Sequence, residues 1–368
     1  MKNVLRIVPI IIALVLLPTS CGNSDDDVNF NLGNGGNTDG GGLGSGSEPD
    51  DCLGFDENDL ILSIQSQKAE APAKISILFK VTDDLGNPVA GLTADQFTIY
   101  EQGRNDDCFN VISSSESQAR ISPNAQVFNN NALLVLDLSN SVLESSLEEL
   151  KTAAVSFVNN VMPANETDSF QMAIYWFDGE DELHLLNPLT SSIAELSGAI
   201  EGITADISND PSTDLYGAVI KSTEIANNLI KETDNTIIGA TSVTIFTDGT
   251  DQASRYTESS ALNAVDNADP NVSLFTIGLG AEIDQEVLRE IGKTASVVAA
   301  NKEELETTFN QISARVTEQA NSFYLFEYCT PKRDGSGENN LVIQLTDGAQ
   351  QGAVQTKFSA NGFTGGCE

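Results

Sequence analysis

Short apolar runs alternate with longer amphipathic stretches through the middle of the chain. The apolar runs have the length and the β-branched or aromatic content of buried strands. Between them, apolar residues recur every three or four positions, which is the spacing of one helix face. The predicted strands cover residues 133–136, 171–177, 242–247 and 272–278. The predicted helices cover residues 147–161, 215–229 and 305–316.

This alternation predicts a doubly wound α/β domain over residues 129–320. Strands that alternate with helices form a mostly parallel sheet, because each helix carries the chain back to the start of the next strand. The helices then cover both faces of the sheet, since every amphipathic helix needs an apolar surface to pack on.

The two flanks of this region have a β-type pattern instead. Residues 74–81 and 96–100 on one side, and 322–328, 341–345 and 354–358 on the other, are strand-like runs separated by turn residues. The termini of a doubly wound domain can lie close together, so it can be inserted into another domain. We therefore expect residues 51–128 and 321–368 to form one small β-sandwich-like domain. Two separate β units are the alternative, and a disulfide between the flanks would favour the sandwich.

The N-terminus has the pattern of an export signal. Lys2 and Arg6 precede an apolar run over residues 7–17, which is too short to span a bilayer but suits a signal peptide over 1–20. The sequence that follows, ending at Cys21, resembles a bacterial lipobox, in which the signal is cut before a cysteine that is then lipidated. Plain secretion with a free Cys21 is the alternative. Residues 21–50 are rich in Gly, Asn and Asp, which predicts a flexible tether.

The lipid anchor implies a place in the bacterial cell envelope. We expect the protein to be attached to the outer membrane, with the lipid anchor as its only contact with the bilayer. The acidic run 24–27 after Cys21 resembles the surface-export signals of some outer-membrane lipoproteins, although it could equally serve to solvate the tether. Which face of the membrane the protein occupies is left open.

Charge and cysteine content narrow the function classes. The 368 residues include 18 Lys and Arg and 54 Asp and Glu, for a net charge of −36. Such a chain is excluded as an ordinary nucleic-acid-binding protein, which needs basic residues to displace phosphate counterions.

With Cys21 lipidated, the remaining cysteines can form two disulfides in three possible connectivities. These cysteines are Cys52, Cys108, Cys329 and Cys367.

Oxygen-bearing side chains gather where the predicted strands end. Asp137, Ser139 and Ser141 follow the first strand, Thr213 precedes a helix, and Asp248 follows the third strand. Ligand sites of open α/β sheets lie outside the carboxyl ends of the strands. Carboxylate and hydroxyl oxygens suit a hard divalent cation.

These residues resemble the von Willebrand factor type A (VWA) domain and its metal-ion-dependent adhesion site, or MIDAS. Its pattern is Asp-x-Ser-x-Ser after the first strand, then a Thr and an Asp in two later loops. The resemblance covers residues 131–320 and implies a Rossmann-like VWA fold. It implies Mg²⁺ or Mn²⁺ bound directly by Ser139, Ser141 and Thr213, with Asp137 and Asp248 acting through water. It also implies a protein partner that offers a carboxylate to the metal.

Other candidate residues have simpler interpretations. We expect His184, the only histidine, to be structural or exposed on a short edge strand. The acidic turn 178–182 is expected to be a solvated hairpin rather than a second cation site. Trp176 is expected in the core, on the strand beside the first one.

Together these features predict a non-enzymatic, lipid-anchored binding protein that grips its partner through the metal, in adhesion or in assembly of an envelope complex. One alternative is a structural envelope protein with an idle metal site. Another is a non-catalytic subunit of an ATPase-coupled enzyme system, as in cytoplasmic members of the family.

Overall fold

A computed structural model describes residues 46–55, 59–113, 120–123, 128–231, 238–332 and 337–364, all within one unit of the chain. The predicted signal peptide, Cys21 and Cys367 lie outside these ranges. In the described ranges, no helix combines the length and the apolar character needed to cross a membrane.

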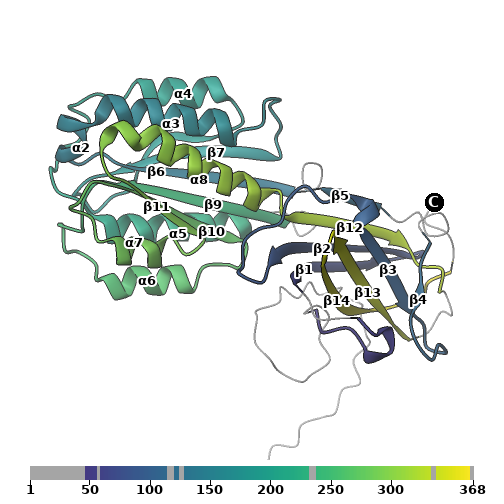
Figure 1. Cartoon of the computed structure of the whole chain (residues 1–368). Coiled ribbons are helices and arrows are strands. Elements are labelled where there is room, and N and C mark those ends of the chain that lie inside the picture. Colours follow the sequence, from purple (N-terminus) through teal and green to yellow (C-terminus); the bar gives the residue numbers. More distant parts are fainter. Residues whose placement is uncertain are drawn as a thin grey trace, which may run out of the picture. The chain divides into compact units, whose positions relative to one another are not determined.

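A six-stranded sheet forms the centre of the α/β region (Figure 1). The strand order is β11-β10-β9-β6-β7-β8, and every pair is parallel except β7 with β8. This is the mostly parallel, doubly wound sheet that the sequence predicts. The strands are β6 (Phe128–Asp137), β7 (Phe170–Phe177), β8 (His184–Thr190), β9 (Ile238–Thr247), β10 (Val272–Leu279) and β11 (Ala295–Ala299).

Helices cover both faces of this sheet. In Figure 1, α3, α4 and α8 lie on one face, and α5, α6 and α7 lie on the other. The helices are α2 (Asn140–Ser145), α3 (Leu147–Val161), α4 (Ile193–Glu201), α5 (Leu215–Lys231), α6 (Glu258–Asp266), α7 (Gln285–Ile291) and α8 (Leu305–Ala320), with a short 3-10 turn, η4 (Lys302–Glu304).

Strand β6 lies between two hydrophobic cores because alternate side chains point to opposite faces. Leu134 and Leu136 pack in the core beneath α3 and α8, whereas Leu133 and Val135 pack in the core beneath α5. Burial of both faces explains why this strand is a continuous apolar run. Asp137 is the last residue of this strand and therefore lies at the carboxyl edge of the sheet.

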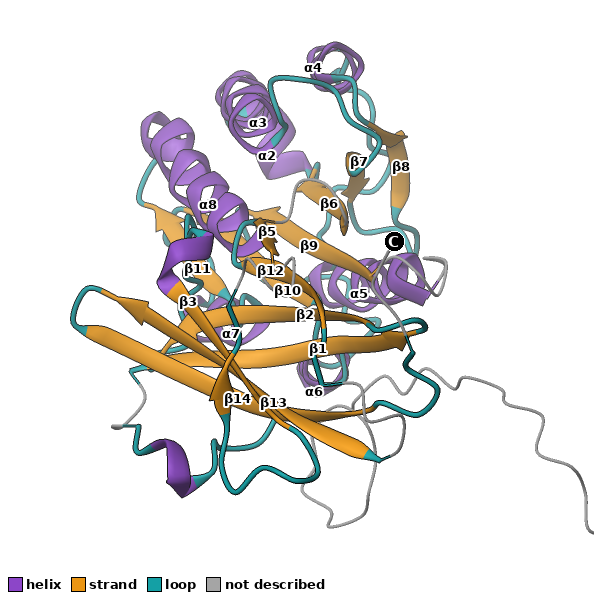
Figure 2. Cartoon of the chain, turned by 90° about the vertical axis from the view of Figure 1, so that its right-hand side faces the viewer, coloured by secondary structure: helices purple, strands orange, loops and turns teal. Residues whose placement is uncertain are grey.

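The flanking segments form two antiparallel sheets (Figure 2). One has the order β1-β2-β12-β5 and the other β14-β13-β3-β4, and residues from both fill a shared hydrophobic core. The strands are β1 (Leu60–Glu70), β2 (Lys74–Asp83), β3 (Phe97–Gln102), β4 (Asn110–Val111), β5 (Arg120–Pro123), β12 (Phe323–Cys329), β13 (Glu338–Asp347) and β14 (Gln350–Ser359), with 3-10 turns η1 (Asp51–Leu53) and η2 (Ala94–Gln96).

Both sheets mix strands from the two ends of the chain. Strand β12 pairs with β2 and β5, and β13 pairs with β3. The predicted sandwich built from N- and C-terminal segments is therefore confirmed. The chain enters the α/β region after β5 and leaves it at β12, and these two strands are hydrogen-bonded neighbours.

A disulfide between the flanks, which would have favoured the sandwich, is not what joins them. Cys52 bonds to Cys108, both in the N-terminal flank. Cys329 is also disulfide-bonded. Pairing of the strands themselves holds the flanks together.

The sequence places the C-terminal end of the tether too late, at residue 50, because the chain already pairs with a strand at Ser47. Ser47 exchanges two backbone hydrogen bonds with Gln355 of β14, at 2.8 and 2.9 Å. A Cβ on Gly46 would lie 2.1 Å from the Val354 side chain, so the backbone packs closely against β14 here. The unpaired edge of β14 offers backbone donors and acceptors that this segment satisfies.

Candidate functional site

The predicted site residues come together at the carboxyl edge of the central sheet. Asp137 ends β6, Ser139 caps the N-terminus of α2, and Ser141 lies in the first turn of that helix. Asp248 directly follows β9, which pairs with β6. Thr213 is buried in the loop before α5. Neighbouring parallel strands place these loops at one edge of the sheet, as expected for open α/β sheets.

Hydrogen bonds link the first loop to the third. The hydroxyl oxygens of Ser139 and Ser141 lie 3.2 Å apart, and the Ser141 hydroxyl donates to Oδ1 of Asp248 at 2.9 Å. The backbone N–H of Ser139 donates to Oδ1 of Asp137 at 2.9 Å. The two carboxylates are thus held beside the two serine hydroxyls.

The Thr213 loop is fixed mainly through its backbone. Its carbonyl oxygen accepts hydrogen bonds from the N–H groups of Gln252 and Ala253, at 2.8 and 3.0 Å. A Cβ on Gly249 would lie 3.9 Å from the Thr213 hydroxyl oxygen, so Thr213 lies beside the loop that carries Asp248. Among the described residues, no direct hydrogen bond joins the Thr213 hydroxyl to the other four predicted ligands.

Thr247 is a residue of this site that the sequence analysis did not single out. Its hydroxyl donates to Oδ2 of Asp137 at 2.7 Å and is itself fully buried. Within a β-rich run a threonine is simply a good strand former. Its position immediately before the predicted ligand Asp248 is the signal that could have identified it.

Burial makes the charge of the two carboxylates unfavourable. Asp137 has no exposed surface, and its burial, followed by the nearby negative charge of Asp248, raises the pKa of Asp137 to about 7. Hydrogen bonds from Thr247 and Ser139 oppose this rise. Burial also raises the pKa of Asp248, against the hydrogen bond from Ser141. A bound cation would offset the repulsion between the carboxylates.

The donor set therefore fits a hard divalent cation. Two carboxylates and three hydroxyls provide oxygen ligands only, which Mg²⁺ and Mn²⁺ prefer. Ser139, Ser141 and Thr213 would hold the ion, and Asp137 and Asp248 would balance its charge.

The acidic turn 178–182, at the end of the neighbouring strand β7, is less solvated than the sequence predicts. Asp178 directly follows β7, whereas Asp137 is the last residue of β6, and Asp178 is fully buried rather than solvated. His184 lies on the edge strand β8 as expected, and Trp176 is buried on β7. Asp178 is buried because the loop over residues 208–214 covers it, which its sequence neighbours alone do not indicate.

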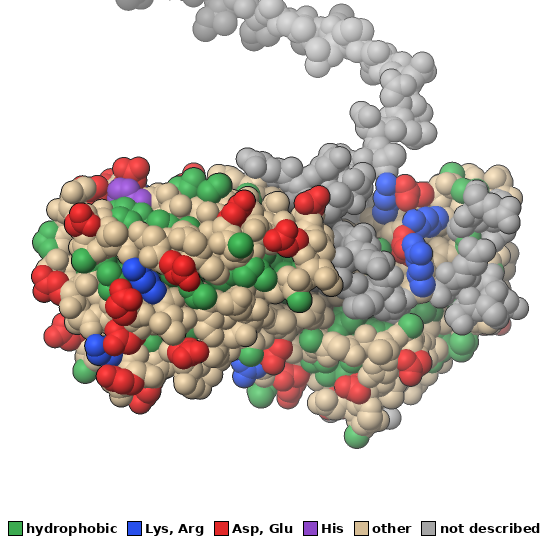
Figure 3. All heavy atoms as spheres, turned by 90° about the horizontal axis from the view of Figure 1, so that it is seen from above, with side chains coloured by type: hydrophobic (Ala, Val, Ile, Leu, Met, Phe, Trp, Pro, Cys, Tyr) green, Lys and Arg blue, Asp and Glu red, His purple; other side chains and the backbone are tan. Residues whose placement is uncertain are grey.

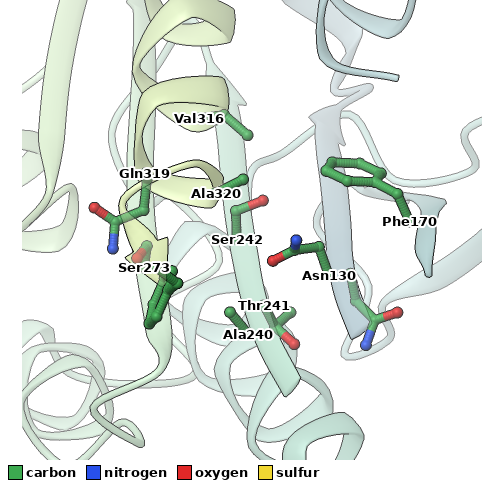
Figure 4. Close-up of a pocket in the computed structure, with 11 residues that line it drawn as sticks. Asn130, Phe170, Ala240, Thr241, Ser242, Ser273, Val316, Gln319 and Ala320 are labelled. Atoms are coloured by element: carbon green, nitrogen blue, oxygen red, sulfur yellow. The ribbon is translucent and has the colours of Figure 1, made fainter. Parts of the chain in front are cut away.

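A small pocket lies at the opposite end of the same sheet (Figure 4). It is lined by neutral side chains such as Asn130 of β6, Thr241 of β9 and Gln319 of α8. Asn130 and Asp137 are separated by about 23 Å along β6 at the usual strand rise. The pocket is therefore unrelated to the cluster of oxygen ligands.

Comparisons with known proteins agree with this fold. A model of the von Willebrand factor type A domain matches residues 131–315. A search of curated proteins finds no significant match.

Three solved structures illustrate the similarity. A von Willebrand factor type A protein from Catenulispora acidiphila is 10% identical, with 83% of this chain and 74% of that chain covered and a TM-score of 0.44. The conserved hypothetical protein BatB from Bacteroides thetaiotaomicron is 17% identical, with 52% and 99% covered and a TM-score of 0.41. Proximal thread matrix protein 1 from the mussel byssus, with a zinc-occupied MIDAS motif, is 14% identical, with 53% and 50% covered and a TM-score of 0.43.

Proposed function

Because the chain belongs to the von Willebrand factor type A family, we propose that it binds a protein partner through a divalent cation, Mg²⁺ or Mn²⁺, without catalysing a reaction. The observation that carries the proposal is the convergence of Asp137, Ser139, Ser141, Thr213 and Asp248 at one edge of the sheet. Three neutral hydroxyls among the ligands would leave a bound cation Lewis-acidic, open to a carboxylate oxygen of the partner.

The protein's own charge explains why a cation is needed for such a partner. The chain carries a net charge of −36 and would repel an acidic protein at low salt. At physiological ionic strength this repulsion is screened beyond about 8 Å. At contact, Asp137 and Asp248 would still repel a carboxylate, and only a positive charge between them and the partner makes the last step attractive.

The place of action belongs to the same proposal. We propose that Cys21 is lipidated and anchors the protein in the bacterial cell envelope, at the outer membrane. The predicted export signal supports this, as do the disulfides, which persist in oxidising compartments. The segment after the tether pairs with Gln355 of β14. The anchor would therefore be attached to the two antiparallel sheets and not to the metal site.

Metal binding is tested by calorimetric titration of Mg²⁺ and Mn²⁺ into the purified chain and two variants. Asp137→Ala should abolish saturable binding. Asp168→Ala removes the same charge from an exposed position and should bind as the wild type does. Equal binding by Asp137→Ala and the wild type would place any metal elsewhere and overturn the proposed site.

Partner binding is tested with the same variants immobilised on beads. Proteins captured from an envelope fraction in Mg²⁺ should be released by EDTA and should not be captured by Asp137→Ala. Capture that persists in EDTA and in Asp137→Ala would show that the metal site is idle in recognition.

A further inference from the structure

A second group of metal-binding side chains lies between the end of β7 and the start of β8. Asp178, Glu180 and His184 each place one ligand atom within 4.8 Å of the others. In Figure 3 the histidine, in purple, lies beside acidic side chains. These residues are distinct from the five ligands of the first site: Asp178 and Glu180 lie in the loop after β7, and His184 begins β8.

Asp178 is a carboxylate that the fold buries completely. Its Oδ1 accepts from the N–H of Glu180 at 2.8 Å, and its Oδ2 accepts from the Ser208 hydroxyl at 2.6 Å and the Asp210 N–H at 3.4 Å. All three donors are neutral, and no ion pair reaches Asp178 from any described residue. Buried carboxylates are normally paired with a cation or a metal, because desolvating an unpaired charge is costly.

The cationic side chains nearby are engaged elsewhere. Lys221 forms ion pairs with Asp181 and Asp214, at 2.5 and 3.5 Å. Arg255 donates two hydrogen bonds to the carbonyl oxygen of Gly179. The negative charge of Asp178 and Glu180 is therefore left for another cation to balance.

His184 presents an unpartnered ring nitrogen to this group. Its ring stacks on Trp176, with centroids 4.0 Å apart and planes within 14°, which fixes its orientation. Nε2 is shielded from solvent and has no hydrogen-bond partner among the described residues. It lies 3.6 Å from Oε2 of Glu180, too far for a hydrogen bond but close to the separation of about 3.4 Å between two ligands of a tetrahedral ion.

We propose that Asp178, Glu180 and His184 form a second metal site, selective for Zn²⁺ over Mg²⁺ and Ca²⁺. An imidazole with two carboxylates is a donor set that Zn²⁺ accepts, whereas Mg²⁺ and Ca²⁺ prefer oxygen alone. The buried Asp178 is oriented by its three hydrogen-bond donors, as metal-binding carboxylates usually are. The half-exposed Glu180 can adjust to close on the ion.

The second site shares a structural element with the first. The carbonyl oxygen of Asp178 accepts from the N–H of Asp214 at 2.8 Å, one residue after Thr213. The carboxylate of Asp178 holds Ser208 and Asp210 of the same loop. The existence of the second site does not depend on the proposed function of the first, so the two are tested separately.

The single histidine gives a direct test. In the purified full chain labelled with ¹⁵N-histidine, only His184 contributes imidazole resonances. Zn²⁺ should shift its Nε2 resonance and saturate at one equivalent, whereas millimolar Mg²⁺ should leave it in place. Zn²⁺ bound only at the first site would not move this resonance.

Two variants identify the remaining ligands. Glu180→Gln should weaken the Zn²⁺ affinity seen by the histidine at least about tenfold. Glu182→Gln changes the same charge at an exposed position outside the group and should have the wild-type affinity. Asp137→Ala, which removes the first site, should also retain the shift. An Nε2 resonance unmoved by millimolar Zn²⁺, or an equal shift in Glu180→Gln, would overturn the proposal.

Discussion

The hydroxyl of Thr247 donates a hydrogen bond to Oδ2 of Asp137 at 2.7 Å, across the pair of strands β9 and β6. Both groups are fully buried. The bond fixes the carboxylate at the base of the first metal site without itself supplying a ligand. Thr247 is therefore a positioning residue, in the way that hydrogen-bond partners of ligands orient other metal sites.

Thr247→Val should weaken binding of Mn²⁺ by about 10–100-fold, because Asp137 loses the partner that orients it. The fold should be retained, since valine has nearly the same shape and suits a strand. Calorimetric titration measures the affinity.

Thr241→Val is the matched control on the same strand. Thr241 is buried near the opposite end of β9, and its hydroxyl has no hydrogen-bond partner among the residues that the structure describes. Its removal should leave the Mn²⁺ affinity unchanged. An equal loss in both variants would mean that valine perturbs β9 as a whole.

Gly179→Ala should disturb the loop that leads to Thr213. A Cβ there would lie 1.9 Å from the Ser212 hydroxyl and 2.3 Å from a carboxylate oxygen of Asp210, so the loop must shift. We expect a loss of Mn²⁺ affinity and a lower melting temperature, with a cost of roughly 1–3 kcal/mol for overpacking.

Gly198→Ala is the control for this substitution. Gly198 lies within α4, and no described residue outside the adjoining helix backbone comes within 4 Å of its Cβ position. Alanine there should raise stability by about 0.5–1 kcal/mol, because glycine is the poorer helix former. Metal affinity should not change. If Gly179→Ala behaved like Gly198→Ala, the close approach at Gly179 would have no role in placing Thr213.

Replacement of both Cys52 and Cys108 by serine should lower stability by roughly 2–4 kcal/mol. The bond closes a segment with a sequence separation of 56, which restricts the unfolded chain. Urea unfolding measures the effect. Mn²⁺ affinity should be retained, because both cysteines lie in the N-terminal flank and not in the α/β region. A loss of Mn²⁺ affinity would show that the disulfide supports the metal site as well.

Glu101→Gln should stabilise the protein at neutral pH. Burial raises the pKa of Glu101, against hydrogen bonds from Thr330 and Asn339. A carboxyl group whose pKa is higher in the folded state favours folding at low pH, and its contribution is lost as the pH rises through the folded pKa. Glutamine keeps the acceptor oxygen and carries no charge.

Melting temperatures measured across a pH series check this prediction. The advantage of Glu101→Gln should grow as the pH rises from about 4.5, the ordinary pKa of the group, and should be absent below it. Glu338→Gln, an exposed substitution on β13, should show no such trend. A constant difference at every pH would mean that the charge of Glu101 has no part in the effect.

The sequence was sufficient to predict the elements whose patterns are local. The apolar face of α3 and the buried run in β6 indicate their own structure, and Asp137, Ser139 and Ser141 are found because they follow such a strand. The partner of Cys52 and the burial of Asp178 depend on loops that meet only in the folded chain. Thr247 is similar, since its role comes from a contact with Asp137, 110 residues away.

The pairing of β5 with β12 has a consequence for how such a protein can be built and rebuilt. Pro123 of β5 and Tyr324 of β12 lie opposite one another in antiparallel register. A short turn could join them and leave a continuous hairpin in the sheet. The α/β region is thus an insertion whose two ends lie side by side, at Pro123 and Tyr324. It could be exchanged for another member of its family while the sheets that receive it, and the attachment of the segment at Ser47, stay as they are.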